Sequence, residues 1–178
     1  GLLLFSNCSN SKQEKATYKE KIQDWQNERL KNLKAEDGWL NLAGLYWLEE
    51  GKNTIGSDSS NNVVFPDKAP KNLGAIQLQN NEIIFRAKED AIVANQEGEK
   101  IDTTLMNHDQ QDNTTILQHG PLKWFVIKRG NKIGIRLRDL QSPLLDKLDS
   151  IPSFPVNRKW RIEAEFIPYE EDKYMEVP

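Results

Sequence analysis

The side chains suited to metal or acid–base chemistry are few in this chain of 178 residues. The polar stretch MNHDQQDNTT holds His108, Asp109 and Asp112, and His119, the other histidine, follows it. All four are metal-ligand types, but their spacing matches neither the zinc nor the calcium pattern. We expect a solvated loop with no metal and no cofactor, and metal binding is the alternative.

A second group of reactive side chains belongs to a predicted β-hairpin. The segment from Leu122 to Leu140, LKWFVIKRGNKIGIRLRDL, has Gly130 and Asn131 at its centre, a pair suited to a two-residue turn. That turn pairs Arg129 with Lys132 and fixes the register of the whole hairpin.

With this register, alternate hairpin residues share a face. One face is expected in the core: Trp124, Val126, Ile135 and Leu137. The other face mixes apolar and cationic groups, with Phe125 directly opposite Arg136, so that the guanidinium is able to stack on the ring. We predict a ligand-binding site here, formed by Phe125, Arg136, Arg138 and Asp139.

Acid–base catalysis finds less support. The alternation from Arg161 to Phe166 predicts a half-exposed strand with Glu163 and Glu165 on its solvent side, whereas a catalytic carboxyl needs burial that raises its pKa. No G-x-S-x-G elbow or Walker loop is present. We therefore predict no catalytic residue, and the alternative is a hydrolase-like enzyme whose site includes Arg136, Arg138 and Asp139.

The elements that position these residues are predicted to be short strands. Turns recur every eight to twelve residues, which predicts a mainly β fold, an antiparallel sandwich or barrel-like pair of sheets with an N-terminal amphipathic helix. Besides the hairpin, strands are expected at 40–43, 45–48, 53–56, 62–65, 75–78, 82–87 and 91–94. We expect a β lobe over 36–105 and a second over 106–178, packed as one domain.

The N-terminus resembles a localisation signal. Cys8 is the only cysteine, and the apolar run Leu2 to Phe5 precedes it. This arrangement resembles the end of a bacterial lipoprotein signal peptide, and we expect the chain to begin within that signal. Residues 1–15 would be a signal-peptide remnant, a lipidation site at Cys8 and a tether, placing the protein at the bacterial envelope, periplasmic or outer-membrane associated. The alternative is a frayed terminus with an incidental thiol.

Residues 16–35 show a helical pattern. Their apolar side chains recur at helical spacing, and Thr17 with Glu20 resembles a capping box at the start. The stripe consists of Tyr18, Ile22, Trp25, Leu30 and Leu33. We expect it to pack on the domain, and partner binding is the alternative.

Charge limits the partners. The formal net charge of -3 argues against a general nucleic-acid partner. Residues 122–161 nevertheless hold ten Lys or Arg against three Asp, while the following residues are acidic. Either these charges compensate one another or the basic residues form an anion-binding surface.

Three runs carry a family resemblance: GWLNLAGLYWLEEGKNTIGSDSSNNVVFPDKAPKNLGAI, FVIKRGNKIGIRLRDL and FPVNRKWRIEAEFIPY. In their order they resemble the bacterial family called domain of unknown function 1684, over residues 37–169. That family has no established activity, so the resemblance implies no function for this chain. The resemblance also implies a further C-terminal portion beyond Val177, and we expect this chain to lack it.

Within the first run, GKNTIGSDSSNNVVFP is similar to the opening of forkhead-associated (FHA) domains, which are phosphothreonine-reading β-sandwiches. Ser57 stands where those domains usually place a phosphate-binding arginine, and no Ser-Arg-x-His occurs around Pro70 to Ala75. A hydroxyl does not replace the two charge-assisted hydrogen bonds of an arginine fork. The similarity therefore implies the scaffold alone, with phosphopeptide binding as the alternative.

Together these features favour a membrane-tethered envelope β-domain that binds a ligand or protein without catalysis. The lipid anchor would be its link to the membrane. The competing hypothesis is the hydrolase-like enzyme, with part of its site in the missing C-terminal portion.

Overall fold

The computed structural model describes residues 8–169, with side chains from residue 17 onward. The apolar run Leu2 to Phe5 therefore lies outside the described residues, as does the sulfur of Cys8. The chain forms two units. One unit combines the chain up to Glu28 with the chain from Ile151, and the other is Arg29–Ser150.

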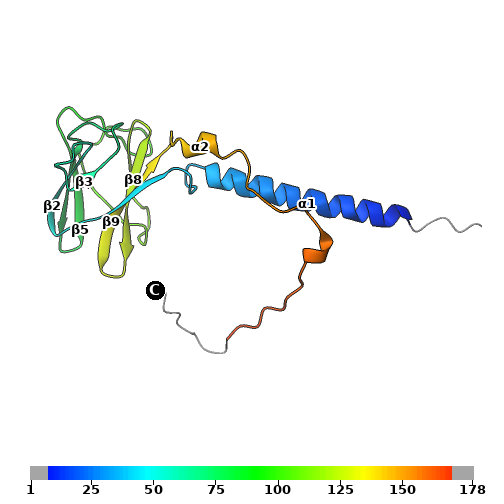
Figure 1. Ribbon diagram of the computed structural model, residues 1–178. Helices are drawn as coiled ribbons and strands as arrows, with labels where there is room; N and C mark the ends of the chain where they lie inside the picture. Colours follow the sequence, from blue (N-terminus) through cyan, green and yellow to red (C-terminus); the bar gives the residue numbers. More distant parts are fainter. Residues whose placement is uncertain (1–7, 170–178) are drawn as a thin grey trace, which may run out of the picture. The chain divides into compact units, whose positions relative to one another are not determined.

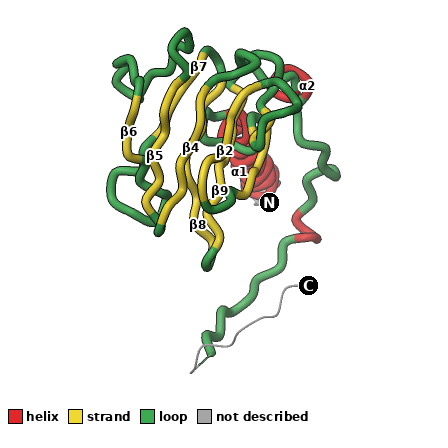
Figure 2. The backbone as a smooth tube through the Cα atoms, turned by 90° about the vertical axis from the view of Figure 1, so that its left-hand side faces the viewer, coloured by secondary structure: helices red, strands yellow, loops and turns green. Residues whose placement is uncertain are grey.

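The Arg29–Ser150 unit is a β-sandwich, which confirms the predicted fold class (Figures 1 and 2). Sheet A has the strand order β1-β9-β8-β7, and sheet B has the order β3-β2-β4-β5-β6. All strand pairs are antiparallel except β2 with β3. The strands are β1 (Leu42–Trp47), β2 (Gly51–Gly56), β3 (Val63–Val64), β4 (Gly74–Gln79), β5 (Glu82–Ala87), β6 (Thr103–Leu105), β7 (Ile116–His119), β8 (Leu122–Arg129) and β9 (Lys132–Asp139).

One hydrophobic core joins the two sheets, because alternate residues of each strand point between them. Trp124 of sheet A lies at its centre and contacts two rings edge-on. Its ring centroid is 5.5 Å from that of Phe65, which follows β3, and 5.8 Å from that of Phe85 in sheet B. All three side chains are almost completely buried.

The hairpin prediction is confirmed in register and in face. Arg129 pairs with Lys132 across the turn, and Phe125 lies opposite Arg136. Gly130 has a φ of 55°, the left-handed conformation that glycine adopts without a steric penalty. The four residues assigned to the core face are fully buried: Trp124, Val126, Ile135 and Leu137.

Other strand predictions need correction. The two strands expected within 40–48 are one strand, β1. Residues 91–94 form only isolated bridges through Ala94, and the short strands β6 and β7 were not predicted. Because β1 pairs with β9, strands from both sides of the expected lobe boundary at residue 105 share one sheet.

Helix α1 spans Cys8–Lys34 and so starts before the expected residue 16. Its residues up to Glu28 belong to the other unit, and its last turns belong to the Arg29–Ser150 unit. Thr17 is consequently inside the helix and does not cap its start. From Ile151 the chain is extended apart from the short helix η1 (Arg158–Trp160). In the described part of the chain, no helix has the length and apolarity needed to cross a membrane.

The predicted strand from Arg161 to Phe166 is absent from the described structure. The predicted strand would place Ile162 and Phe166 on the side opposite Glu163 and Glu165, which was expected to be buried, yet they are 86% and 88% exposed. Alternation alone does not make a strand, because a strand needs a neighbouring edge to satisfy its backbone hydrogen bonds. No such edge pairs with this segment in residues 8–169.

Candidate functional site

The predicted ligand-binding residues lie in β8 and β9 of sheet A. Arg136 is flanked across the sheet by Phe125 in β8 and Leu45 in β1. We call the outward side chains around it the Arg136 face: Leu45, Trp47, Phe125, Ile127 and Arg136. Leu45 and Trp47 are 45% and 44% exposed, so apolar surface at the β1 edge reaches solvent beside the guanidinium.

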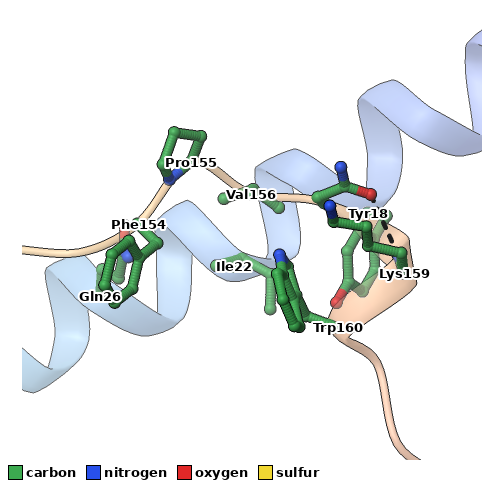
Figure 3. Close-up of a pocket in the computed structure, with 9 residues that line it drawn as sticks. Tyr18, Ile22, Gln26, Phe154, Pro155, Val156, Lys159 and Trp160 are labelled. Atoms are coloured by element: carbon green, nitrogen blue, oxygen red, sulfur yellow. Dashed lines mark hydrogen bonds between the residues drawn. The ribbon is translucent and has the colours of Figure 1, made fainter.

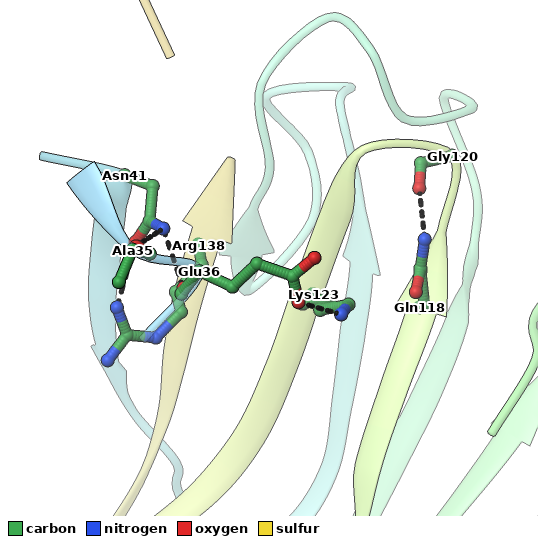
Figure 4. Close-up of polar contacts among 7 residues, drawn as sticks. All are labelled: Ala35, Glu36, Asn41, Gln118, Gly120, Lys123 and Arg138. Atoms are coloured by element: carbon green, nitrogen blue, oxygen red, sulfur yellow. Dashed lines mark hydrogen bonds and ion pairs between the residues drawn. The ribbon is translucent and has the colours of Figure 1, made fainter. Parts of the chain in front are cut away.

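Arg138 shares the outward side of β9 with Arg136, but its guanidinium is hydrogen-bonded to other residues of the chain (Figure 4). It donates hydrogen bonds to the carbonyl oxygen of Gly38 and, at 2.8 Å, to Oδ1 of Asn41. Burial lowers the pKa of Arg138; the charge of Asp37 opposes this effect and that of Arg136 adds to it. Arg138 thus fastens the chain before β1 to β9.

Lys123 is a further cation on this side of sheet A, and it is also paired. Its Nζ lies 2.6 Å from a carboxylate oxygen of Glu36, an ion pair drawn in Figure 4. Glu36 belongs to the turn between α1 and β1. Lys123 and Arg138 therefore both bind the segment that connects α1 to β1.

Asp139 does not join the two arginines. Successive strand residues point to opposite sides of a sheet, so Asp139 lies on the side away from Arg138. Its carboxylate is 2.6 Å from Nζ of Lys68 and accepts a hydrogen bond from the backbone N–H of Gln141 at 2.9 Å. An acid fixed in this way, apart from Arg136 and Arg138, does not form a catalytic trio with them.

Arg136 differs from these neighbours. Its Nε is buried, and no described residue accepts a hydrogen bond from it. The expected stacking on Phe125 is not among the cation–π contacts of the described residues; instead Nζ of Lys132 lies 5.6 Å from the centre of the Trp47 ring. The buried Nε is out of reach of a ligand, but no ion pair among the described residues includes Arg136. The outer nitrogens of its guanidinium are therefore the groups of this face to which an anion is able to bond.

The MNHDQQDNTT loop is held by Asp109. One carboxylate oxygen accepts the N–H of Lys128 at 3.0 Å, and the other lies 2.7 Å from Nη1 of Arg129. Nδ1 of His108 accepts the N–H of Gln110 within the loop. Among the described residues, no group of three His, Cys, Asp or Glu side chains is arranged to hold a metal ion.

Asp109 should make the stability of this loop depend on pH. Burial acts to raise the pKa of Asp109, but the hydrogen bonds from Lys128 and Arg129 and the positive charges outweigh it, and the net shift is downward. A lowered folded-state pKa gives stabilisation that is complete above the unfolded pKa of about 3.9 and is lost as the pH falls through the folded value.

Asp109→Asn tests this linkage. We expect the variant to be about 1 kcal/mol less stable at pH 7, with a gap that closes as the pH falls through the lowered folded-state pKa and the native carboxylate is protonated. Urea unfolding of both proteins across this range measures it. A gap independent of pH would assign the loss to packing and not to the charge.

Three asparagines that sequence reasoning passed over organise the chain around the site: Asn41, Asn53 and Asn61. All three are buried, and their side chains bond to backbone groups. Asn41 donates to the carbonyl oxygens of Ala35 and Glu36 while accepting from Arg138. The available signal was asparagine within an otherwise apolar run, as in WLNLAG, where a buried amide must find partners.

An apolar groove of about 760 Å³ lies in the unit that contains α1 (Figure 3). Tyr18, Ile22 and Gln26 of α1 line one side, and the segment 154–160 lines the other. Gln26 donates to the hydroxyl of Ser153 at 2.9 Å, and Arg158 lies over the ring of Tyr18. Part of the predicted helix stripe is thus covered by this segment.

Comparison with known proteins gives limited guidance. No family model matches the chain, and no curated protein matches it. Domain of unknown function 1684 is therefore not supported by these comparisons.

Solved structures to which the chain is similar include FHA domains. One comes from a study of phosphothreonine-dependent FHA interactions: 12% identity, TM-score 0.36, covering 53% of this chain and 92% of that one. Another is the FhaA FHA domain, with 12% identity and a TM-score of 0.37, covering 53% of this chain and 97% of that one. A third is the FHA-2 domain of a Mycobacterium tuberculosis ABC transporter, with 15% identity and a TM-score of 0.36, covering 50% of this chain and 77% of that one. Such values transfer no ligand and no site residue to this chain.

Proposed function

We propose that the β-sandwich is a non-catalytic binding module that takes an anionic ligand or protein segment on the Arg136 face. The observation that supports this most is that Arg136 belongs to no ion pair of the described residues, whereas the neighbouring cations Lys123 and Arg138 already have internal partners. A guanidinium with a free donor offers charge-assisted hydrogen bonds to a carboxylate, phosphate or sulfonate.

The surroundings of Arg136 favour a ligand with apolar as well as anionic parts. Leu45 and Trp47 are each almost half exposed next to it. Burying such side chains contributes about 25 cal/mol per Å² of apolar area removed from water. The separation of Asp139 from the arginines supports binding over acid–base chemistry.

Arg136→Ala tests this function with the anionic aromatic dye anilinonaphthalene sulfonate as the probe. We expect the variant to bind the dye with a dissociation constant about tenfold larger, equivalent to about 1.4 kcal/mol of binding free energy. The free energy of unfolding should change by less than about 1 kcal/mol. Fluorescence titration measures the first quantity and urea unfolding the second. The charge-matched control is Lys147→Ala, an exposed lysine at the end of α2 (Leu144–Lys147), which should bind like the parent protein.

Two results would count against the Arg136 face. If Arg136→Ala binds the dye as the parent does, the face is not the site. If the variant instead unfolds, Arg136 is a structural residue and the unpartnered Nε reflects packing.

We also propose that Cys8 carries the lipid that holds the module at a bacterial envelope membrane. The support is the sequence pattern before Cys8, and a second acyl chain or more makes such anchoring stable. Palmitate labelling in the host should mark the parent protein and leave the Cys8→Ser variant unlabelled and out of the membrane fraction. Equal labelling of both proteins would contradict the anchor.

A further inference from the structure

Sheet B carries a second candidate site, a groove of about 510 Å³ on its outward side. Strands β2, β4 and β5 form its floor, together with the residues just outside β4 and β5. The lining is mainly polar, and its charged members are all cations: Lys52, Thr54, Asn72, Gly74, Ala75, Gln77, Ile84, Arg86, Ala87 and Lys88. We call it the sheet B groove.

The strand register builds this groove. Lys52 pairs with Gln77, and Gln77 pairs with Ile84; one step along, Thr54 pairs with Ala75, and Ala75 with Arg86. These residues alternate with the buried ones, so all of them point away from the core.

Small residues make the centre of the groove hollow. Ala75 lies between Thr54 and Arg86, and Gly74 begins β4 beside it. Gly74 also lines the groove and has no side chain to occupy it. The hollow follows from the small side chain of Ala75 between the longer side chains of Thr54 and Arg86.

The cations around the hollow have no acidic neighbours in the lining. Among the described residues, no ion pair includes Lys52, Arg86 or Lys88. This contrasts with sheet A, where Lys123 is paired with Glu36. Three unpaired positive charges around a polar hollow are complementary to an anion.

We infer that the sheet B groove binds a ligand carrying two or more phosphate groups. Lys52 and Arg86 start from strands two positions apart, a separation of about 10 Å across the sheet, which suits two anionic groups better than one. The guanidinium of Arg86 is able to hold one phosphate through two hydrogen bonds, and the lysines add compact charges. Asn72, Thr54 and Gln77 supply neutral polar groups for the rest of the ligand.

Calorimetric titration of the full chain with inorganic pyrophosphate tests the inference. We expect Arg86→Gln to weaken binding by about tenfold or more, since a bond to a charged group is lost. Ala75→Leu should weaken it to a similar extent by filling the hollow without changing any charge. Lys147→Gln, the matched control outside the groove, should leave the affinity unchanged.

Vesicles of phosphatidylcholine with cardiolipin, a lipid that carries two phosphate groups, form a second arm. Pyrophosphate binding without vesicle binding identifies a soluble ligand, whereas vesicle binding that Arg86→Gln abolishes places the phosphates on a lipid.

The inference is overturned if the parent protein does not bind pyrophosphate or such vesicles. It is overturned equally if Ala75→Leu binds as the parent does, or if Lys147→Gln loses as much affinity as Arg86→Gln, because either result means attraction without a shaped site. Arg86→Gln and Ala75→Leu change only the sheet B groove, so a loss of affinity in both is independent of the Arg136 face.

Discussion

Trp124→Ala should unfold the sandwich or bring it close to unfolding. The side chain is fully buried and contacts Phe65 and Phe85 edge-on. Truncating a buried tryptophan to alanine costs about 3 to 5 kcal/mol through lost apolar burial and the cavity that remains. Small domains have total stabilities of about 5 to 15 kcal/mol, so the loss is a large part of the whole. Urea unfolding followed by circular dichroism measures it.

Trp124→Phe is the matched control for this prediction. It keeps an aromatic ring against Phe65 and Phe85 and removes the indole Nε1, which is buried without a described hydrogen-bond partner. Because an unsatisfied buried donor is itself unfavourable, the control should cost far less than the alanine variant. Equal losses for the two variants would mean that the indole has a polar role in place of the packing role assigned here.

The hairpin of β8 and β9 was predictable because local signals agree with one another. The Gly130–Asn131 turn fixes the register, and the alternation of apolar residues selects the face toward the core. Both signals depend on residues close in sequence. The pairing of Phe125 with Arg136 followed from them.

The role of Arg138 was not predictable, since it depends on residues about one hundred positions away. Its partners, Gly38 and Asn41, precede β1, and only the pairing of β1 with β9 brings them close. The same holds for Asp139 and Lys68. Sequence pattern places a side chain on a face, but long-range topology decides whether another protein group already occupies it.

The alternating segment from Arg161 to Phe166 shows the limit of periodicity. Its pattern is as regular as that of β9, yet Arg161 bonds to Glu163 two residues on, at 2.6 Å, and the segment has no strand partner among residues 8–169. The sequence pattern did not predict the sheet B groove, because the groove is assembled only when separate strands pair. Its cations come from different strands, and none of the runs of sequence that contain them is conspicuously basic.

The loop after β2 depends on Gly56 for its closure. The backbone of Ser57 bonds to Pro70 and that of Phe65 bonds to Gly56, while the buried amide of Asn61 donates to the carbonyl oxygen of Lys71 at 2.8 Å. A Cβ on Gly56 would be 2.1 Å from that same oxygen. The obstacle is backbone, so a rotamer change does not relieve it.

Gly56→Ala should therefore destabilise the protein by about 3 kcal/mol, at the upper end of ordinary overpacking costs. The φ of Gly56 is not positive, so backbone strain is excluded as the cause. Gly120→Ala is the matched control: Gly120 has a φ of 53° but open space around its Cβ position, and we expect a cost of about 1 kcal/mol from conformation alone.

Urea unfolding of both variants separates the two causes. A larger loss for Gly56→Ala, together with faster amide exchange at Ser57 and Asp58, whose N–H groups bond to Pro70 and Lys71, would show that the loop has moved away from β2 to admit the methyl group. If Gly56→Ala were no more costly than Gly120→Ala, the Asn61 bridge would tolerate displacement. The close approach of Lys71 to β2 would then be a consequence of the fold and not a condition for it.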